Sequence, residues 1–152
     1  MIIGLSADSK QHLYDVVSEY LKQNGYEVKT YGALAGENAA DYVSAAGDLA
    51  EAIAIGECDE GVLLCNTGTG VSIVANKVAG VRAAVCVDEF SAEIAKIANN
   101  ANILVLSMRL TGDMLARQIL DRWFATDPAK ADERRRGLHQ RTDEFDRKHR
   151  RA

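Results

Sequence analysis

Short apolar runs alternate along the chain with longer stretches in which apolar residues recur every three or four positions. The short runs predict strands over residues 1–5, 27–31, 61–65, 82–87 and 103–106. The longer stretches predict helices over residues 11–24, 41–56, 71–78, 91–99 and 111–124. The run over residues 61–65 is continuously apolar, which is typical of a strand buried on both faces of a parallel sheet. We therefore expect an α/β fold with a doubly wound, five-stranded, Rossmann-like parallel sheet and ligands at the carboxyl ends of its strands.

Polar residues and glycines mark the boundaries of these elements. Residues 6–9, Ser-Ala-Asp-Ser, interrupt the first apolar run with side chains that can cap the first helix, and Gly25 is its stop signal. Asp41 begins the second helix after a loop over residues 32–40 that is rich in small residues. The glycine-rich segment 66–70 is a turn that opens the third helix.

Composition narrows the classes of partner and the compartment. The chain has 152 residues, 47% hydrophobic and 26% charged, which suits an ordinary globular protein. Its net charge of −4 argues against a general binder of nucleic acid or anionic membranes, because such proteins concentrate positive charge. The apolar runs are too short for a signal peptide or a membrane helix. The odd set of Cys58, Cys65 and Cys86 lacks paired spacing, so we expect a reducing, cytoplasmic location.

The composition changes abruptly after Asp127 and Pro128. Residues 130–152 hold nine of the eighteen Lys and Arg residues and little apolar content. The pattern allows a surface helix, a disordered basic end, or an arm that reaches a partner subunit. We divide the chain into a Rossmann-like domain over residues 1–126 and a basic carboxyl-terminal segment over residues 127–152.

The strongest candidate for chemistry is the segment LCNTGTGV over residues 64–71, which sets Cys65 at the end of a buried strand and before a glycine-rich turn. Backbone N–H groups of such a turn stabilise negative charge on a bound anion or on an oxyanion that forms during a reaction. We expect this field to favour the thiolate of Cys65, which is a base or a nucleophile. A buried, inert thiol beside a packing turn stays open on these residues alone. The sequence argues against a nucleotide-binding site, because this segment does not match G-x-G-x-x-G and the chain has no P-loop motif.

The longer segment LCNTGTGVSIVANKVAGVRAAVC resembles the motif CGTGxGxxxxANKxxGxRxAxx of ribose-5-phosphate isomerase B and its relatives, the galactose-6-phosphate isomerase subunits. The resemblance also includes, at the family's intervals, Asp41-Tyr42, Ser91-Ala92, residues 99–102, Met108-Arg109 and Thr111-Gly112. It implies an aldose–ketose isomerase of phosphorylated sugars that uses no metal or other cofactor. It also implies a homodimer or tetramer with shared active sites.

The resemblance assigns roles to the residues of the turn. The cysteine at the position of Cys65 moves the proton next to the carbonyl, and the backbone of the TGxG turn holds the resulting enediolate. The matching positions are Thr67, Gly68, Thr69 and Gly70. Members that lack the cysteine use a glutamate where this chain has Val71, so Cys65 is the candidate base. Asn66 replaces the family's glycine, which asparagine can do because it tolerates a left-handed backbone, and it could also bind substrate.

The family holds the phosphate with arginines, and its pattern implies that Tyr42 also binds substrate. Arg109 matches the arginine that follows a late strand. The tail offers Arg136 and Arg141 in a segment similar to the family's R-H-x-x-R, although a gap is needed to align them. Bidentate arginine suits phosphate geometry, so this resemblance favours a tail that reaches a neighbouring subunit over a solvated end.

The departures from the family concern ring opening. Ribose-phosphate members use an Asp-His pair after the first strand and a second histidine before the Asn of the fourth loop. Here Asp8 is followed by Ser9, Ala98 precedes Asn99, and no histidine occurs between residues 12 and 139. Ring opening needs an acid and a base that titrate near neutrality, and neither serine nor alanine has a side chain that does so. We expect Asp8, a catalytic candidate beside Cys65 and Thr67, to orient the substrate's hydroxyl and carbonyl groups together with Ser9 and Asn99.

A sugar phosphate that cannot close a ring would not need those histidines. In a tetrose or tetrulose 4-phosphate the phosphate occupies the hydroxyl that would form the five-membered ring. We therefore expect an open-chain substrate such as erythrose or erythrulose 4-phosphate. The alternative is interconversion of ribose 5-phosphate and ribulose 5-phosphate, with the ring opened slowly by Asp8, Ser9 and water, or by His12 or His139. A non-catalytic isomerase subunit and a phosphosugar-binding protein also stay open.

Overall fold

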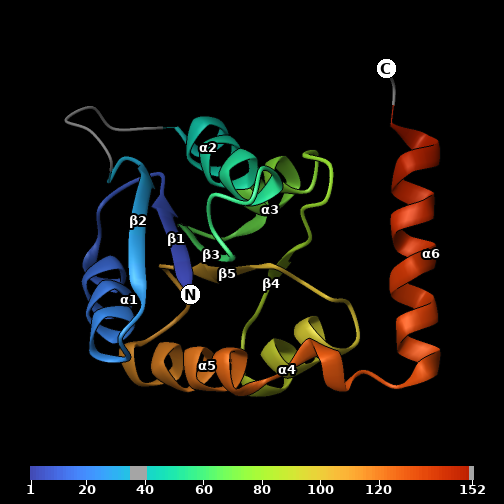
Figure 1. Ribbon diagram of the computed structural model, residues 1–152. Helices are drawn as coiled ribbons and strands as arrows, with labels where there is room; N and C mark the ends of the chain where they lie inside the picture. The colour runs from blue at the N-terminus through green and yellow to red at the C-terminus, as the bar shows by residue number, and fades with distance from the viewer. Residues whose placement is uncertain (35–40, 151–152) are drawn as a thin grey trace.

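A computed structural model of the protein describes residues 1–34 and 41–150, and within them the chain forms a five-stranded sheet (Figure 1). The strand order is β2-β1-β3-β5-β4, and all four pairings are parallel. The strands are β1 (Ile2–Ala7), β2 (Glu27–Gly32), β3 (Glu60–Cys65), β4 (Ala83–Val85) and β5 (Ile103–Ser107). The expected fold class is confirmed. Most of the loop predicted over residues 32–40 lies outside the described residues.

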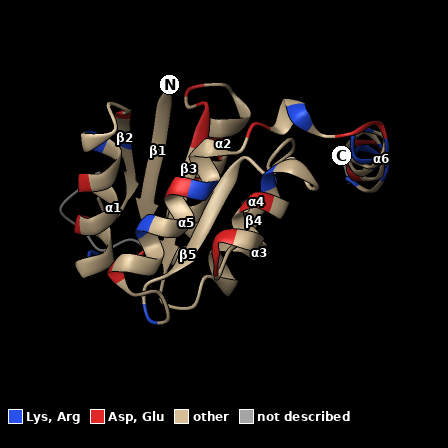
Figure 2. Ribbon diagram, turned by 90° about the horizontal axis from the view of Figure 1, so that it is seen from below, with Lys and Arg blue, Asp and Glu red and all other residues tan. Residues whose placement is uncertain are grey.

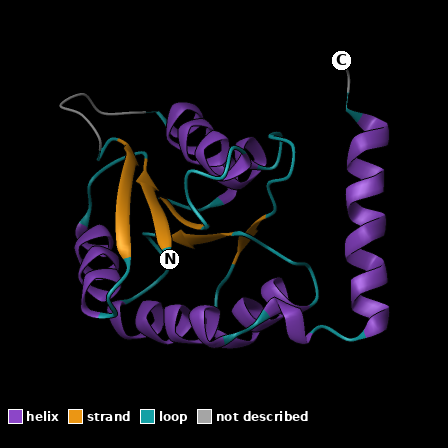
Figure 3. Ribbon diagram, in the orientation of Figure 1, coloured by secondary structure: helices purple, strands orange, loops and turns teal. Residues whose placement is uncertain are grey.

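Helices cover both faces of the sheet (Figures 1 and 3). The helices on one face are α1 (His12–Gln23), α4 (Glu89–Ile97) and α5 (Asp113–Ala125), and those on the other are α2 (Tyr42–Ala54) and α3 (Thr69–Ala75). Alternate residues of β3 enter the two cores, because successive side chains of a strand point to opposite faces. Val62 and Leu64 pack with α1, α4 and α5, whereas Leu63 and Cys65 pack with α2 and α3. This explains why the strand is continuously apolar.

The direction of winding reverses between β1 and β3. The chain leaves β1 toward α1 on one face and leaves β3 toward α3 on the other. The two strands are neighbours, with Ala7 opposite Leu64. Loops that depart to opposite faces open a crevice at the carboxyl ends of such strands, where α/β proteins bind their ligands. The residues that follow Ala7 and Leu64 therefore face one another across the reversal point.

The caps of the helices explain where two of them begin. Asp41 is the N-cap of α2, and its Oδ1 accepts the Ser44 N–H at 2.7 Å, as its residue type predicts. The expectation that residues 6–9 cap the first helix is wrong. α1 begins after Gln11, which makes no side-chain cap bond. The Asp8 carboxylate turns toward β3 instead, and Ser9 Oγ donates to Asp8 Oδ1 at 3.4 Å.

The basic carboxyl-terminal segment forms a short 3₁₀ turn (Pro128–Lys130) and the helix α6 (Glu133–His149). Figure 1 shows α6 standing apart from the layered domain, and Figure 2 shows it end-on with both acidic and basic residues along it. None of the residues of α6 is buried within this chain. The tail is therefore helical rather than irregular, and its side chains are accessible within one chain. Over residues 1–34 and 41–150, no helix has the length and apolar character needed to cross a bilayer.

Candidate active site

Cys65 is the last residue of β3, at the reversal point of the sheet, and it is only 6% exposed. Its Sγ lies 3.8 Å from Asp8 Oδ2, so the thiol donates to a carboxylate that follows the neighbouring strand. The expected grouping of Asp8, Ser9 and Cys65 is therefore present within one chain. A carboxylate, and a thiol once it has lost its proton, are two groups that can each accept a proton from a substrate.

Neither of the other two cysteines has this setting. Cys86 follows β4, and its burial raises the pKa of its thiol to about 12. Cys58 is buried, and its Sγ lies 3.3 Å from the Tyr31 hydroxyl. Among the described cysteines, Cys65 is thus the one whose sulfur contacts a carboxylate at the reversal point of the sheet.

The turn after Cys65 depends on the glycine at position 68. Gly68 has a φ of +89° and is the N-cap of α3. The backbone angle favours glycine, and a Cβ at this position would also lie 3.2 Å from Val105 Cγ1, a tight approach. Beside it, the hydroxyls of Thr67 and Thr69 lie 2.9 Å apart and hydrogen-bond to each other. The result is a tight turn with its polar groups at the mouth of the crevice.

Tyr42 lies directly on this turn. A Cβ built on Gly70 would approach the Tyr42 ring to 3.0 Å, so the ring rests where a side chain at position 70 would stand. Tyr42 is also 48% exposed, which leaves part of its surface for a ligand. The structure thus brings together Tyr42 from α2 and the turn that follows β3.

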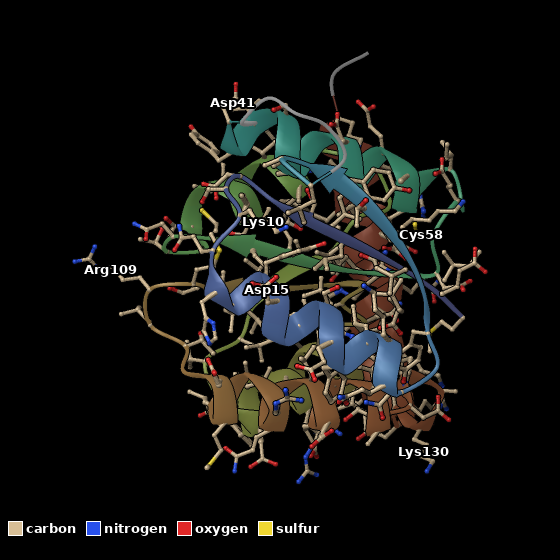
Figure 4. All side chains as sticks on the ribbon, turned by 90° about the vertical axis from the view of Figure 1, so that its left-hand side faces the viewer. Lys10, Asp15, Asp41, Cys58, Arg109 and Lys130 are labelled. Carbon is tan, nitrogen blue, oxygen red and sulfur yellow. The ribbon has the colours of Figure 1, made fainter. Side chains whose placement is uncertain are left out.

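The loop after β5 reaches the same place. The Met108 N–H donates to the Cys65 carbonyl at 2.7 Å, and the Arg109 N–H donates to the Asn66 carbonyl at 3.2 Å. Figure 4 shows the Arg109 side chain extended away from the body of the domain. Its backbone is therefore held beside Cys65, while its guanidinium extends outward from the domain.

One buried polar residue of this region was missed in the sequence. Ser107 ends β5, pairs in register with Cys65 and is 4% exposed. Its hydroxyl donates to the Asn66 carbonyl at 2.7 Å and accepts the Leu110 N–H at 3.1 Å. A serine at the end of an otherwise apolar strand, ILVLS, was the signal that could have found it.

Asn99 does not lie with Cys65 in one chain. It follows α4 and precedes β5, whereas Cys65 is paired with the last residue of β5. Four residues of strand, about 13 Å at a rise of 3.3 Å each, separate the two ends of β5. Asn99 instead lines a groove of the opposite end of the sheet, together with Ala84 and with Leu138 and Thr142 of α6.

The arginines of the tail lie at that opposite end as well. The Arg136 guanidinium donates to the Ala131 carbonyl of its own chain. Arg141 is exposed on α6, which meets the rest of the chain through the His139 contact with Ala98, just after α4, and the ion pair of Asp143 with Arg82, just before β4, at 3.7 Å. Within one chain, the structure therefore brings neither Arg136 nor Arg141 to Cys65.

His12 and His139, the two histidines considered for ring opening, each form a hydrogen bond away from Asp8 and Ser9. His12 Nε2 lies 2.8 Å from Asp113 Oδ2, and this hydrogen bond raises the pKa of an imidazole that is 74% exposed. His139 donates its Nε2–H to the Ala98 carbonyl at 3.0 Å, because a carbonyl oxygen can only accept. An imidazole thus stands beside Ala98, although it comes from α6.

Comparison with known proteins gives concordant matches. A family model described as Ribose/Galactose Isomerase matches residues 3–139. The chain is 43% identical over 124 residues to D-erythrulose-4-phosphate isomerase of Pectobacterium atrosepticum, which covers 80% of this chain and 81% of that protein. It is 42% identical over 105 residues to ribose-5-phosphate isomerase B of Escherichia coli, covering 69% and 70% of the two. The structure of Clostridium thermocellum ribose-5-phosphate isomerase B aligns with a TM-score of 0.90 at 36% identity, over 99% of this chain and 100% of that one.

Proposed function

Because this chain belongs to the ribose/galactose isomerase family, we propose that it interconverts an open-chain aldose 4-phosphate and its ketose, of the erythrose and erythrulose type. The chain is a sugar-phosphate isomerase of this family. The observation that carries the finer proposal is the contact of Cys65 with Asp8, which has Ser9 as its neighbour, while the nearest imidazole in sequence, His12, is bonded to Asp113. A substrate that arrives open needs the isomerisation step alone.

Isomerisation requires two proton transfers, and the crevice offers one group for each. The Cys65 thiolate takes the proton from C2 of the aldose, or from C1 of the ketose, and returns it to the adjacent carbon through a cis-enediolate. The Asp8 carboxylate, 3.8 Å from the sulfur, carries the hydroxyl proton between the two neighbouring oxygens. Each proton taken from the substrate is given back, so the reaction is redox-neutral and needs no external oxidant or reductant.

The negative charge of the enediolate falls beside the turn that follows Cys65. The backbone N–H groups of Gly68 and Gly70 and the Thr67 hydroxyl are the donors for its oxygens, since a tight turn before a helix presents its N–H groups outward. The Thr69 N–H between them donates to Thr67 Oγ1 at 3.4 Å. Asn66 and Thr69 contribute side chains at the same rim. The Tyr42 ring, which lies against Gly70, is placed to contact a substrate bound at this turn. These groups bind and stabilise, whereas Cys65 performs the proton transfer.

We infer that the functional unit is a homodimer or a tetramer with shared active sites. Asn99, Arg136 and Arg141 lie at the opposite end of the sheet from Cys65, so a site that contains all of them draws them from a second copy. The exposed face of α6 supports this inference, since Phe145 is 66% exposed and no residue of the helix is buried. Arg109 of one copy and the tail arginines of the other would then hold the phosphate.

The substrate proposal predicts that kcat/KM is higher for erythrulose 4-phosphate than for ribose 5-phosphate. Purified protein assayed alone with both sugars measures this directly. Turnover also excludes a non-catalytic subunit and a phosphosugar-binding protein. A higher kcat/KM for ribose 5-phosphate would contradict the open-chain proposal.

One observation favours ribose 5-phosphate as the second candidate substrate. His139 lies 3.0 Å from the Ala98 carbonyl and so brings an imidazole to the position where ribose-phosphate members carry their second histidine. In that case His139→Gln abolishes activity on ribose 5-phosphate, while the activity on erythrulose 4-phosphate stays. Equal loss on both sugars would show that His139 holds α6 in place and takes no part in ring opening.

A further inference from the structure

Two loops meet at the carboxyl ends of β3 and β5, and each carries one half of the proposed chemistry. The turn after β3 begins at Cys65, and the loop after β5 carries Arg109. Their backbones are joined by the Met108 N–H, which donates to the Cys65 carbonyl at 2.7 Å, and by the Arg109 N–H, which donates to the Asn66 carbonyl at 3.2 Å. The distance between the base and the arginine is therefore set where these two segments touch.

The Ser107 side chain hydrogen-bonds to both of these segments. Its Oγ donates to the Asn66 carbonyl at 2.7 Å, so that carbonyl receives two donors, and the same Oγ accepts the Leu110 N–H at 3.1 Å. Ser107 is 4% exposed, and the four residues before it in β5 are apolar and fully buried. A single buried hydroxyl thus fixes the turn after Cys65 on one side and the loop of Arg109 on the other.

We propose that Ser107 is a positioning residue that holds Cys65 and Arg109 at the separation the isomerisation requires, an inference that rests on the proposed function. The Asn66 carbonyl and the Thr67 N–H belong to one peptide plane, so the direction of this carbonyl fixes how the turn begins. Losing the hydroxyl leaves the Leu110 N–H without this acceptor and the Asn66 carbonyl with one donor fewer. Both segments then gain freedom to move relative to each other.

The test compares Ser107→Ala with two other variants. Ser107→Thr keeps the hydroxyl. Ser6→Ala is a matched control, because Ser6 is also fully buried near the end of a strand and its Oγ donates to a backbone carbonyl, that of Ala45, at 2.8 Å. We expect Ser107→Ala to lower kcat/KM for erythrulose 4-phosphate by about 10- to 100-fold, with a lower kcat and a higher KM, since both the base and the arginine are displaced. Ser107→Thr recovers part of this loss, and Ser6→Ala keeps kcat and KM near those of the unmodified protein.

A second readout needs no substrate. The rate at which iodoacetamide alkylates Cys65, followed by peptide mass spectrometry, reports the surroundings of its thiol. We expect Ser107→Ala to change this rate severalfold and Ser6→Ala to leave it unaltered. Unchanged kinetics and alkylation in Ser107→Ala, or equal changes in Ser6→Ala, would overturn the proposal. If the unmodified protein converts no tetrose or pentose phosphate, the proposed function fails, and the alkylation rates still decide whether Ser107 positions Cys65.

Discussion

A buried charged cluster at the amino end of β3 gives the sharpest prediction for stability. Lys96 of α4 is 3% exposed and forms an ion pair with Glu60 Oε1. Trp123 of α5 donates its Nε1–H to Glu60 Oε2 at 2.6 Å, and the Lys96 ammonium lies 4.9 Å from the centre of the Trp123 ring. Glu60 thus satisfies two buried donors that come from two different helices.

The cost of breaking this cluster depends on which partner is removed. Glu60→Gln leaves the Lys96 ammonium buried without its counter-charge, and removing one member of a buried pair costs about 3–5 kcal/mol. We expect the lower end, about 3 kcal/mol, because 18% of the Glu60 side chain is exposed and admits water. Lys96→Met keeps the apolar stem over Trp123 and leaves Glu60 with its Trp123 bond, so we expect a loss of only about 1 kcal/mol.

Urea denaturation, followed by circular dichroism, measures these free energies of unfolding. The double variant Glu60→Gln with Lys96→Met is the control, because it removes both charges, and we expect it to be more stable than Glu60→Gln alone. The cluster lies at the amino end of the strands, away from Cys65, so kcat should hold in all three variants. The reasoning is refuted if Glu60→Gln unfolds within about 0.5 kcal/mol of the unmodified protein, a difference typical of surface substitutions.

Two further predictions concern the shared site and a helix cap. We expect Cys65→Ala and Arg141→Ala each to be nearly inactive alone. Unfolded and refolded together, the two variants should recover activity, because a mixed oligomer contains one site with both an intact Cys65 and an intact Arg141. Recovery no greater than in the separate refolding controls would rule out a shared site. The Ser91 N–H donates to Asp88 at 2.7 Å and lowers the pKa of that carboxyl below its ordinary value of 3.8. The stabilisation from Asp88 is therefore complete above pH 3.8 and is lost as the pH falls through the lowered pKa. The variant Asp88→Asn caps the helix without titrating. The unmodified protein should therefore melt at a higher temperature than Asp88→Asn at pH 6 but not at about pH 2. A difference in melting temperature that does not change with pH would speak against this cause.

The fold was predictable because local and global signals agree along most of the chain. The apolar run over residues 61–65 is buried on both faces, and Asp41 caps the helix that it precedes. β4 is shorter than predicted, Ala83–Val85 in place of residues 82–87, since it is an edge strand that pairs only with β5. Periodicity locates elements well, but pairing decides how long an edge strand stays regular.

The site was predictable only in part, because its contacts are tertiary. Asp8 could cap a helix by its residue type, and only the neighbouring strand, 57 residues further along the chain, turns it toward Cys65. Asn99 follows a helix, so strand topology alone places it at the amino end of β5, whereas the family resemblance grouped it with Cys65 without saying which subunit provides it. The hydrogen-bond partners of Glu60 and Ser107 likewise come from distant segments, and no spacing of residues in the sequence predicts them.

The kcat of Cys65→Ala with erythrulose 4-phosphate is the most direct test of the account, since the sulfur is proposed to move the proton itself. The account predicts a fall of about a thousandfold or more, the scale expected when a catalytic base is removed, with the circular dichroism spectrum unchanged. Retention of most of the activity by this variant would contradict the account and leave Asp8 as the base.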